Sequence, residues 1–110
     1  MKNILIIGSL GQLGSEIALE CRKRYGDDHV VLTDIRNDVN KPLVEGGPFY
    51  LVDARDGQSV DTIVKKHDID TIYHLAAVLS ARAEKDPLNA WNLNMGGLIA
   101  SLEVAKANGC

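Results

Sequence analysis

The chain has 110 residues, which is enough for one domain with its own hydrophobic core. Hydrophobic residues make up 45% of it and charged residues 25%, as is usual for folded globular proteins. The net charge of −3 argues against a nucleic-acid surface, and no apolar run approaches the roughly 18 residues of a membrane span. We therefore expect neither nucleic acid nor a membrane among its partners.

The two cysteines, Cys21 and Cys110, have neither metal-binding nor redox spacing. Cys21 falls on the apolar side of a predicted helix, where a buried, reduced thiol is typical. Reduced cysteines favour a soluble intracellular protein, either cytoplasmic or, after removal of a presequence, in the mitochondrial matrix. The densest basic stretch, RKRY from Arg22 to Tyr25, falls where this helix ends, and cations there complement the helix dipole.

Short apolar runs alternate with helical patterns along the chain. The runs predict four buried strands: Asn3 to Gly8, His29 to Asp34, Phe49 to Ala54, and Asp70 to Ala77. A recurrence every four residues predicts a helix after the first strand, with a stripe formed by Leu13, Ile17, Cys21 and Tyr25. This alternation is typical of an α/β protein with a parallel sheet and right-handed crossovers.

Two further helices are predicted from their caps and stripes. Asp56 is expected to cap the first, whose stripe is formed by Val60, Ile63, Val64 and His67. The second begins at Asp86 and Pro87, ends at Gly109, and has a stripe formed by Leu88, Trp91, Met95, Leu98, Leu102 and Ala105. Trp91 and Met95 are predicted to be core residues. The segment from Arg36 to Pro48, rich in Gly, Pro and Asn, is predicted to be a connection in place of a helix.

The stretch GSLGQLG leaves the first predicted strand and opens the first predicted helix. In that setting Gly8 permits a tight turn, Gly11 lets the backbone approach a pyrophosphate, and Gly14 lets helix and strand pack closely. The helix N-terminus offers unpaired N–H groups to the phosphates. Glycine-rich turns also serve purely structural ends, and G-x-x-G-x-x-G is neither the G-x-G-x-x-G form nor a P-loop.

Asp34 lies 20 residues after Gly14, at the end of the second predicted strand. An acid there can bind the adenosine ribose hydroxyls and repels a 2′-phosphate, which favours NAD over NADP. Alternatively, Asp34 is a turn residue, and Arg36 nearby could accept a 2′-phosphate. We predict a Rossmann-type doubly wound parallel sheet in its first, adenine-binding half. It would have about four parallel strands with flanking helices, and residues 1–110 would form one NAD-binding domain.

These motifs resemble the extended short-chain dehydrogenase/reductase superfamily, which includes the nucleotide-sugar epimerases. The stretches GSLGQLGSE, RKRYGDDHVVLTDIR, GGPFYLVDARD and HLAAVLSARAEKDPLNAWNLNMGGL together resemble the N-terminal portion of the short-chain type of L-threonine 3-dehydrogenase. The resemblance covers essentially the whole chain, and TDIR, GPF and LSA are more specific than the glycines.

The resemblance implies a cofactor site and one substrate contact. The NAD pyrophosphate would lie against Gly8, Ser9, Leu10, Gly11, Gln12 and Leu13. The ribose would be surrounded by Asp34, Ile35 and Arg36, and the adenine edge would face Asp53 and Ala54. The rest of the cofactor would be lined by Leu75, Ala76, Ala77 and Asn94, and Ser80 would touch L-threonine.

Several of these residues also have simpler interpretations. Ala76 and Ala77 could be strand-end packing, Asn94 an exposed helix residue, and Ser80 an ordinary loop serine. His74 ends an apolar strand and is predicted to be a packing histidine rather than a catalytic one. No metal site is expected.

The superfamily transfers hydride with a Tyr-x-x-x-Lys pair, in which the lysine lowers the pKa of the tyrosine. Tyr25, Tyr50 and Tyr73 are followed four residues later by His, Ala and Ala, so the sequence predicts no catalytic residue in this chain. We expect the NAD-binding portion of an NAD-dependent L-threonine 3-dehydrogenase, truncated before its catalytic part, inactive alone and a homodimer when complete. The alternatives are a nucleotide-sugar epimerase or dehydratase portion, or a non-catalytic NAD-binding module.

Overall fold

A computed structural model describes residues 2–36, 40–75 and 85–110, with the backbone alone at residues 90 and 93. The helices and strands follow in the order β1 (Ile4–Ile7), α1 (Gln12–Tyr25), the 3-10 turn η1 (Asp27–His29), β2 (Val30–Asp34), α2 (Lys41–Glu45), β3 (Phe49–Leu51), α3 (Gly57–Lys66), β4 (Thr71–His74) and α5 (Pro87–Asn108). The strands lie within the four predicted runs, and each is shorter than its run; residues 76 and 77 of the fourth run lie outside the described residues.

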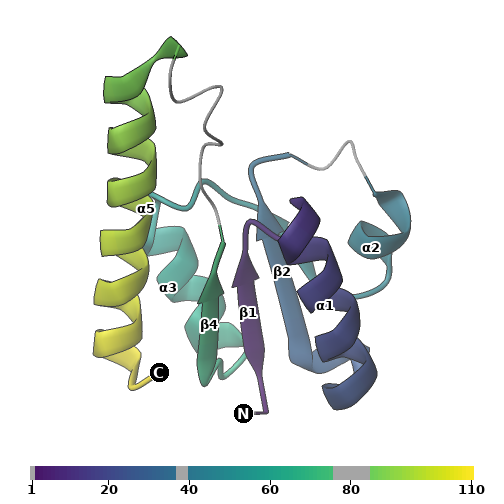
Figure 1. Cartoon of the computed structure of the whole chain (residues 1–110). Coiled ribbons are helices and arrows are strands. Elements are labelled where there is room, and N and C mark those ends of the chain that lie inside the picture. Colours follow the sequence, from purple (N-terminus) through teal and green to yellow (C-terminus); the bar gives the residue numbers. More distant parts are fainter. Residues whose placement is uncertain (1, 37–39, 76–84) are drawn as a thin grey trace.

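The four strands form one parallel sheet in the order β3-β2-β1-β4. Ile4 pairs with Val30 on one side and with Thr71 on the other, so β1 is central and its backbone is hydrogen-bonded along both edges. All four of its side chains are buried, as its continuous apolar sequence predicts. The carboxyl ends of the strands therefore meet at one edge, at the top of Figure 1.

Helices cover both faces of this sheet, which confirms the predicted doubly wound arrangement (Figure 1). Alternate residues of β1 and β2 supply the two cores: Ile4, Ile6, Val30 and Leu32 face α1 and α2, whereas Leu5, Ile7 and Val31 face α3 and α5. The reduced thiol of Cys21 lies in the first core at 8% exposure, and burial raises its pKa.

The predicted helix ends are confirmed by their hydrogen bonds. The Ser59 N–H donates to Asp56 Oδ1 (3.2 Å) at the start of α3, and the Asn89 N–H donates to Asp86 Oδ1 (3.3 Å) at the start of α5. Gly109 ends α5 in the left-handed region at φ 73°. Short-range patterns therefore fix where these helices begin and end.

The predicted irregular connection between β2 and β3 is wrong over five residues, because α2 (Lys41–Glu45) forms within it. Its Leu43 side chain is 3% exposed, and the Asn40 carbonyl accepts the N–H groups of Leu43 and Val44. A helix this short is unstable alone, so it depends on tertiary packing that local sequence does not reveal.

Arg22 is the residue that holds α2 against α1. Its guanidinium is buried and donates from Nη1 to the Leu43 carbonyl (2.7 Å). A Cβ at Gly46 or Gly47 would come within about 3 Å of the guanidinium, so the two glycines leave room for it. The basic stretch does end α1, as predicted, but Arg22 also docks a second helix, and burial lowers its pKa.

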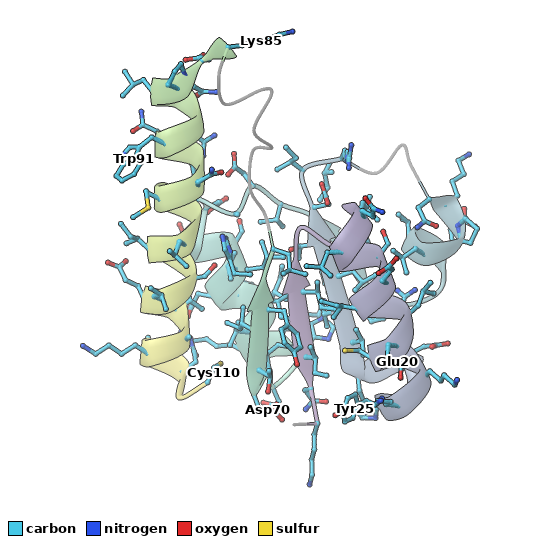
Figure 2. All side chains as sticks on the ribbon, viewed as in Figure 1. Glu20, Tyr25, Asp70, Lys85, Trp91 and Cys110 are labelled. Carbon is cyan, nitrogen blue, oxygen red and sulfur yellow. The ribbon has the colours of Figure 1, made fainter. Side chains whose placement is uncertain are left out.

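Trp91 was predicted to be a core residue and is instead 63% exposed. Figure 2 shows its side chain projecting from α5 away from the sheet. The buried side of α5 is formed by smaller residues, Gly97, Ser101 and Val104, which face α3 and β4. Met95 is half-buried. The predicted apolar stripe of α5 exists, but at Trp91 it faces away from the sheet rather than toward the core.

Folding stability should fall as the pH falls below about 6.5, because of His67. Its Nε2 shares a 2.8 Å hydrogen bond with Tyr50 Oη, and partial burial, together with Lys66, lowers its pKa. The unfolded chain therefore takes up a proton first, and stability present above pH 6.5 is lost as the pH falls through the lower folded pKa. Thermal unfolding at intervals of roughly one pH unit between pH 8 and pH 5 measures this dependence of stability on pH. His67→Gln should flatten the slope, and an unchanged slope would contradict the assignment.

Candidate cofactor-binding site

The glycine loop connects β1 to α1 and is fastened to the end of β2 by its backbone. The N–H groups of Gly8 and Ser9 both donate to the Thr33 carbonyl at 3.0 Å. Gly8 has φ 83°, a left-handed conformation that favours glycine. The loop therefore leaves β1 through a tight turn, as the sequence predicts.

Gly14 and Gly11 face different surroundings. A Cβ on Gly14 would lie 2.3 Å from the Gly8 carbonyl oxygen and 3.0 Å from Ser9 Cα, so α1 packs against the loop as only glycine allows. A Cβ on Gly11 would meet only the Gly8 carbonyl, at 3.6 Å, among the described atoms. Gly11 therefore borders open space in front of the helix N-terminus, which is the room a pyrophosphate needs.

The N-terminus of α1 presents its first backbone N–H groups at the glycine loop. Among the described residues, no side chain caps it and its first turn has no acid. The first N–H groups of a helix have no partner within the helix, and the dipole there is positive. Ser15 Oγ instead lies 2.7 Å from the Gly11 carbonyl and 3.2 Å from the Ser9 carbonyl, so its single proton donates to one of the two and holds the loop behind these N–H groups.

Asp34 joins the end of β2 to the glycine loop. It is 8% exposed, and its Oδ2 accepts the Leu10 N–H (3.0 Å). Its Oδ1 accepts the N–H groups of Ile35 (2.8 Å) and Arg36 (3.3 Å). A carboxylate has about four acceptor positions, so one remains for a ligand hydroxyl.

Arg36 lies over the same carboxylate. Its Nε is 3.8 Å from Asp34 Oδ1, and its Nη2 donates weakly to the Leu10 carbonyl (3.4 Å). Its side chain is 52% exposed, so this is a weak surface contact.

The remaining residues of the loop divide by exposure. Ser9 and Leu10 are buried, and Ser9 Oγ donates to the Thr33 carbonyl. Their backbone N–H groups donate to the Thr33 carbonyl and to Asp34 Oδ2, so both donors are engaged within the chain. Gln12, Leu13 and Ile35 have exposed side chains beside the site.

Asp53 and Ala54 follow β3 at the same edge of the sheet. The preceding Val52 N–H donates to the Asp34 carbonyl (2.9 Å), which holds the end of β3 beside the end of β2. Asp53 is half-buried, and Ala54 is 4% exposed beside Gly97 of α5. Ala54 can therefore contribute only its backbone to a ligand.

The last predicted residues come from β4 and α5. Leu75 is half-buried after β4 and its N–H donates to the Ile7 carbonyl (2.8 Å), while Asn94 is half-buried on α5. His74 is half-buried, with Nδ1 3.0 Å from Ser101 Oγ, as befits a packing histidine. Ala76, Ala77 and Ser80 lie outside the described residues.

The sequence prediction missed Arg55, which forms three hydrogen bonds to Asp53. The signal was present as an Asp-x-Arg spacing directly after the third strand, where both side chains lie at the carboxyl edge. Gly96 leaves room on α5 for the Arg55 stem, since a Cβ there would lie 3.2 Å from Arg55 Cγ.

Within residues 2–36, 40–75 and 85–110, no group of His, Cys, Asp and Glu side chains could hold a metal ion. No helix in that part of the chain is long and apolar enough to cross a membrane.

The chain is similar to proteins about three times its length. An uncharacterized epimerase/dehydratase of Staphylococcus saprophyticus is 49% identical over 106 residues, which are 96% of this chain and 33% of that protein. A relative with the same description from Staphylococcus aureus is 46% identical over the same shares. The chain thus spans about a third of the length of these curated relatives.

Solved structures give a more specific comparison. The L-threonine dehydrogenase of Clostridium difficile is 49% identical with a TM-score of 0.95, over 100% of this chain and 34% of that one. The GalE-like L-threonine dehydrogenase of Cupriavidus necator, in its holo form, is 40% identical with a TM-score of 0.88, over 97% and 34%. These neighbours confirm the resemblance to the threonine dehydrogenases.

The comparisons also agree with NAD as the cofactor. The UDP-glucose 4-epimerase of Thermus thermophilus, a complex with NAD, is 27% identical with a TM-score of 0.84, over 97% of this chain and 34% of that one. The matching family model is described as the NAD dependent epimerase/dehydratase family and extends over residues 4–110. With nearly its whole length matched, this chain belongs to the NAD dependent epimerase/dehydratase family.

Proposed function

We propose that the chain is the NAD-binding portion of an NAD-dependent L-threonine 3-dehydrogenase. The observation that supports this most is the meeting of the uncapped N-terminus of α1, open Gly11 and buried Asp34 at one edge of the sheet. The threonine dehydrogenases among the solved neighbours support the choice of enzyme.

Most of the predicted residues have a role in this proposal. The N–H groups at the start of α1 bind the pyrophosphate, Asp34 accepts from the adenosine ribose, and Asp53 with the Ala54 backbone binds the adenine edge. The remaining proposed cofactor contacts are Ile35, Arg36, Leu75, Ala76, Ala77 and Asn94. Ser80 is the proposed contact with L-threonine.

The proposed overall reaction converts L-threonine and NAD to 2-amino-3-ketobutyrate and NADH, a step in threonine catabolism to glycine. NAD supplies the hydride acceptor when it is bound. This chain orients its adenine half, and the 110 residues contain no Tyr-x-x-x-Lys pair to remove the hydroxyl proton. We therefore expect no turnover from these 110 residues alone.

Two other functions remain candidates. One is a nucleotide-sugar epimerase or dehydratase, since the family model and the curated relatives are described as epimerase/dehydratase. The other candidate is a module that binds NAD without chemistry.

A pair of chimeras tests the proposed enzyme. Residues 1–110 would replace the matching third of the Clostridium difficile L-threonine dehydrogenase and, separately, of the Thermus thermophilus epimerase. We expect threonine-dependent NADH from the first chimera and little sugar epimerisation by the second. A first chimera that folds and binds NAD but produces no NADH from L-threonine would refute the threonine assignment.

We also propose that a second copy covers the exposed side of α5 and forms a homodimer. Leu88, Trp91, Leu98, Ile99 and Leu102 lie along one side of this helix with exposures between 39% and 71%. Such a continuous apolar surface is uncommon on a monomer and typical of an interface.

Trp91→Ser should weaken this self-association at least tenfold, because it removes one large buried side chain from each copy, worth about 1.5–3 kcal/mol. Sedimentation equilibrium of the chain and the variant measures the change. Leu19→Ser is the matched control, since Leu19 is 59% exposed on α1. A wild-type chain that stays monomeric, or an effect as large from Leu19→Ser, would contradict the proposal.

A further inference from the structure

Arg55 lies just beyond β3 and closes a ring of hydrogen bonds onto the side chain of Asp53. Its backbone N–H and its Nε both donate to Asp53 Oδ1, at 2.9 Å and 3.2 Å. Its Nη2 donates to Asp53 Oδ2 at 2.9 Å. Such paired contacts fix the plane of a carboxylate more firmly than one hydrogen bond does.

The position of Arg55 is itself supported from α5. A Cβ on Gly96 would lie 3.2 Å from Arg55 Cγ and 3.3 Å from Cδ, so the Arg55 stem runs close along the helix where glycine leaves room. Arg55 thus connects the end of β3 with α5, although its side chain is 45% exposed.

Asp53 keeps an acceptor position that a ligand could use. A carboxylate offers about two positions on each oxygen, so among the described residues Oδ1 is filled by its two donors and Oδ2 keeps one. The Arg55 hydrogen bond is also the main reason that the pKa of Asp53 is lowered, so the group stays ionised and can only accept.

We infer that Arg55 is a positioning residue that makes the site select a purine with an exocyclic amine over one with a carbonyl at that place. The fixed Asp53 Oδ2 has one open acceptor position, which an amine satisfies and which a carbonyl oxygen would meet with repulsion. The inference rests on the proposed function, in which Asp53 faces the base of NAD.

Binding of NAD and of its hypoxanthine analogue, in which a carbonyl replaces the adenine amine, tests this inference by calorimetry on the 110-residue chain. We expect the wild-type chain to prefer NAD by about 30-fold and Arg55→Ala to reduce that preference to about threefold. Asp53→Ala should reduce it similarly, and the double variant should lose no more than either single one. Arg55→Lys should retain part of the preference.

The ratio of the two dissociation constants separates positioning from a structural role, because general loosening weakens both ligands equally. Arg24→Ala is the matched control, since Arg24 pairs with Glu20 at 2.8 Å on α1 and should leave the ratio unchanged. An Arg55→Ala variant with the wild-type ratio would overturn the inference and leave the proposed function standing. So would a wild-type chain that binds both ligands equally, whereas one that binds neither would overturn the proposed function as well.

Discussion

Gly14→Ala should destabilise the folded chain by about 3 kcal/mol and lower its Tm by roughly 15 °C. The added Cβ would lie 2.3 Å from the Gly8 carbonyl oxygen and about 3 Å from two Ser9 backbone atoms. These are backbone atoms at the turn out of β1, so the strain falls on the contact between α1 and the sheet. NAD binding should be lost with it, because the helix N-terminus moves.

Gly11→Ala is the matched comparison, with the same added methyl group in the same loop. Gly11 has φ −70° and ψ 171°, which alanine adopts freely, and its Cβ would enter open space. Stability should change by less than about 1 kcal/mol, while NAD affinity falls at least tenfold because the methyl occupies the pyrophosphate position. Thermal unfolding and calorimetry measure both quantities. A Gly14→Ala chain as stable as wild type would refute the packing argument, and unchanged NAD affinity in Gly11→Ala would refute the cradle.

Asp34→Ala should lower NAD affinity by at least 100-fold and destabilise the chain by about 2 kcal/mol. The substitution removes the acceptor for the ribose and leaves the buried Leu10 N–H without its partner. It also releases Arg36 from its carboxylate, so the preference for NAD over NADP should disappear. Calorimetric titration with NAD and with NADP measures the two affinities and their ratio, and thermal unfolding measures the stability.

Asp34→Asn separates the charge from the hydrogen bonds. The amide keeps one acceptor oxygen, so stability should suffer less, while the repulsion of a 2′-phosphate is removed. We expect about 100-fold relative gain for NADP over NAD. Asp28→Asn controls for net charge, since Asp28 is exposed in η1, which precedes β2. An Asp34→Asn chain that still rejects NADP as strongly as wild type would show that Asp34 does not set the preference.

Sequence patterns predicted the parts of the fold that depend on local chemistry. The continuous apolar run of β1 predicts burial on both faces, and Asp56 and Asp86 are caps that each satisfy an N–H three residues on. The glycine spacing also predicted the tight turn at Gly8 and the close packing at Gly14. Each depends on the backbone of one residue, where only glycine fits.

The features that were missed depend on partners distant in sequence. Helix α2 is held by Arg22 from α1, and nothing in its five residues signals that contact. Trp91 was assigned to the core because an apolar stripe shows that a helix has two sides without showing which side meets the sheet. Gly97 gives the answer only in three dimensions, where a Cβ would lie 3.1 Å from that of Ala54.

The candidate site was predicted in the same uneven way. Parallel strands end at one edge, so Asp34 could be placed from its position at the end of the second strand, whereas Asp53 was placed only by the family resemblance. The hydrogen bonds of the two carboxylates could not be predicted, because they depend on side-chain geometry. Leu10 donates to Asp34, and Arg55 donates to Asp53. These contacts turn a set of nearby residues into oriented acceptors.

We propose above that the glycine loop, Asp34 and Asp53 bind the adenine half of NAD. Titrating NAD into the isotope-labelled chain and following its backbone amides by NMR tests the claim residue by residue. We expect saturable shifts that are largest at Gly11, Gln12 and Leu13, with further shifts at Ile35 and Ala54. No saturable shifts, or shifts confined to the opposite edge around Asp28 and Asp68, would contradict it.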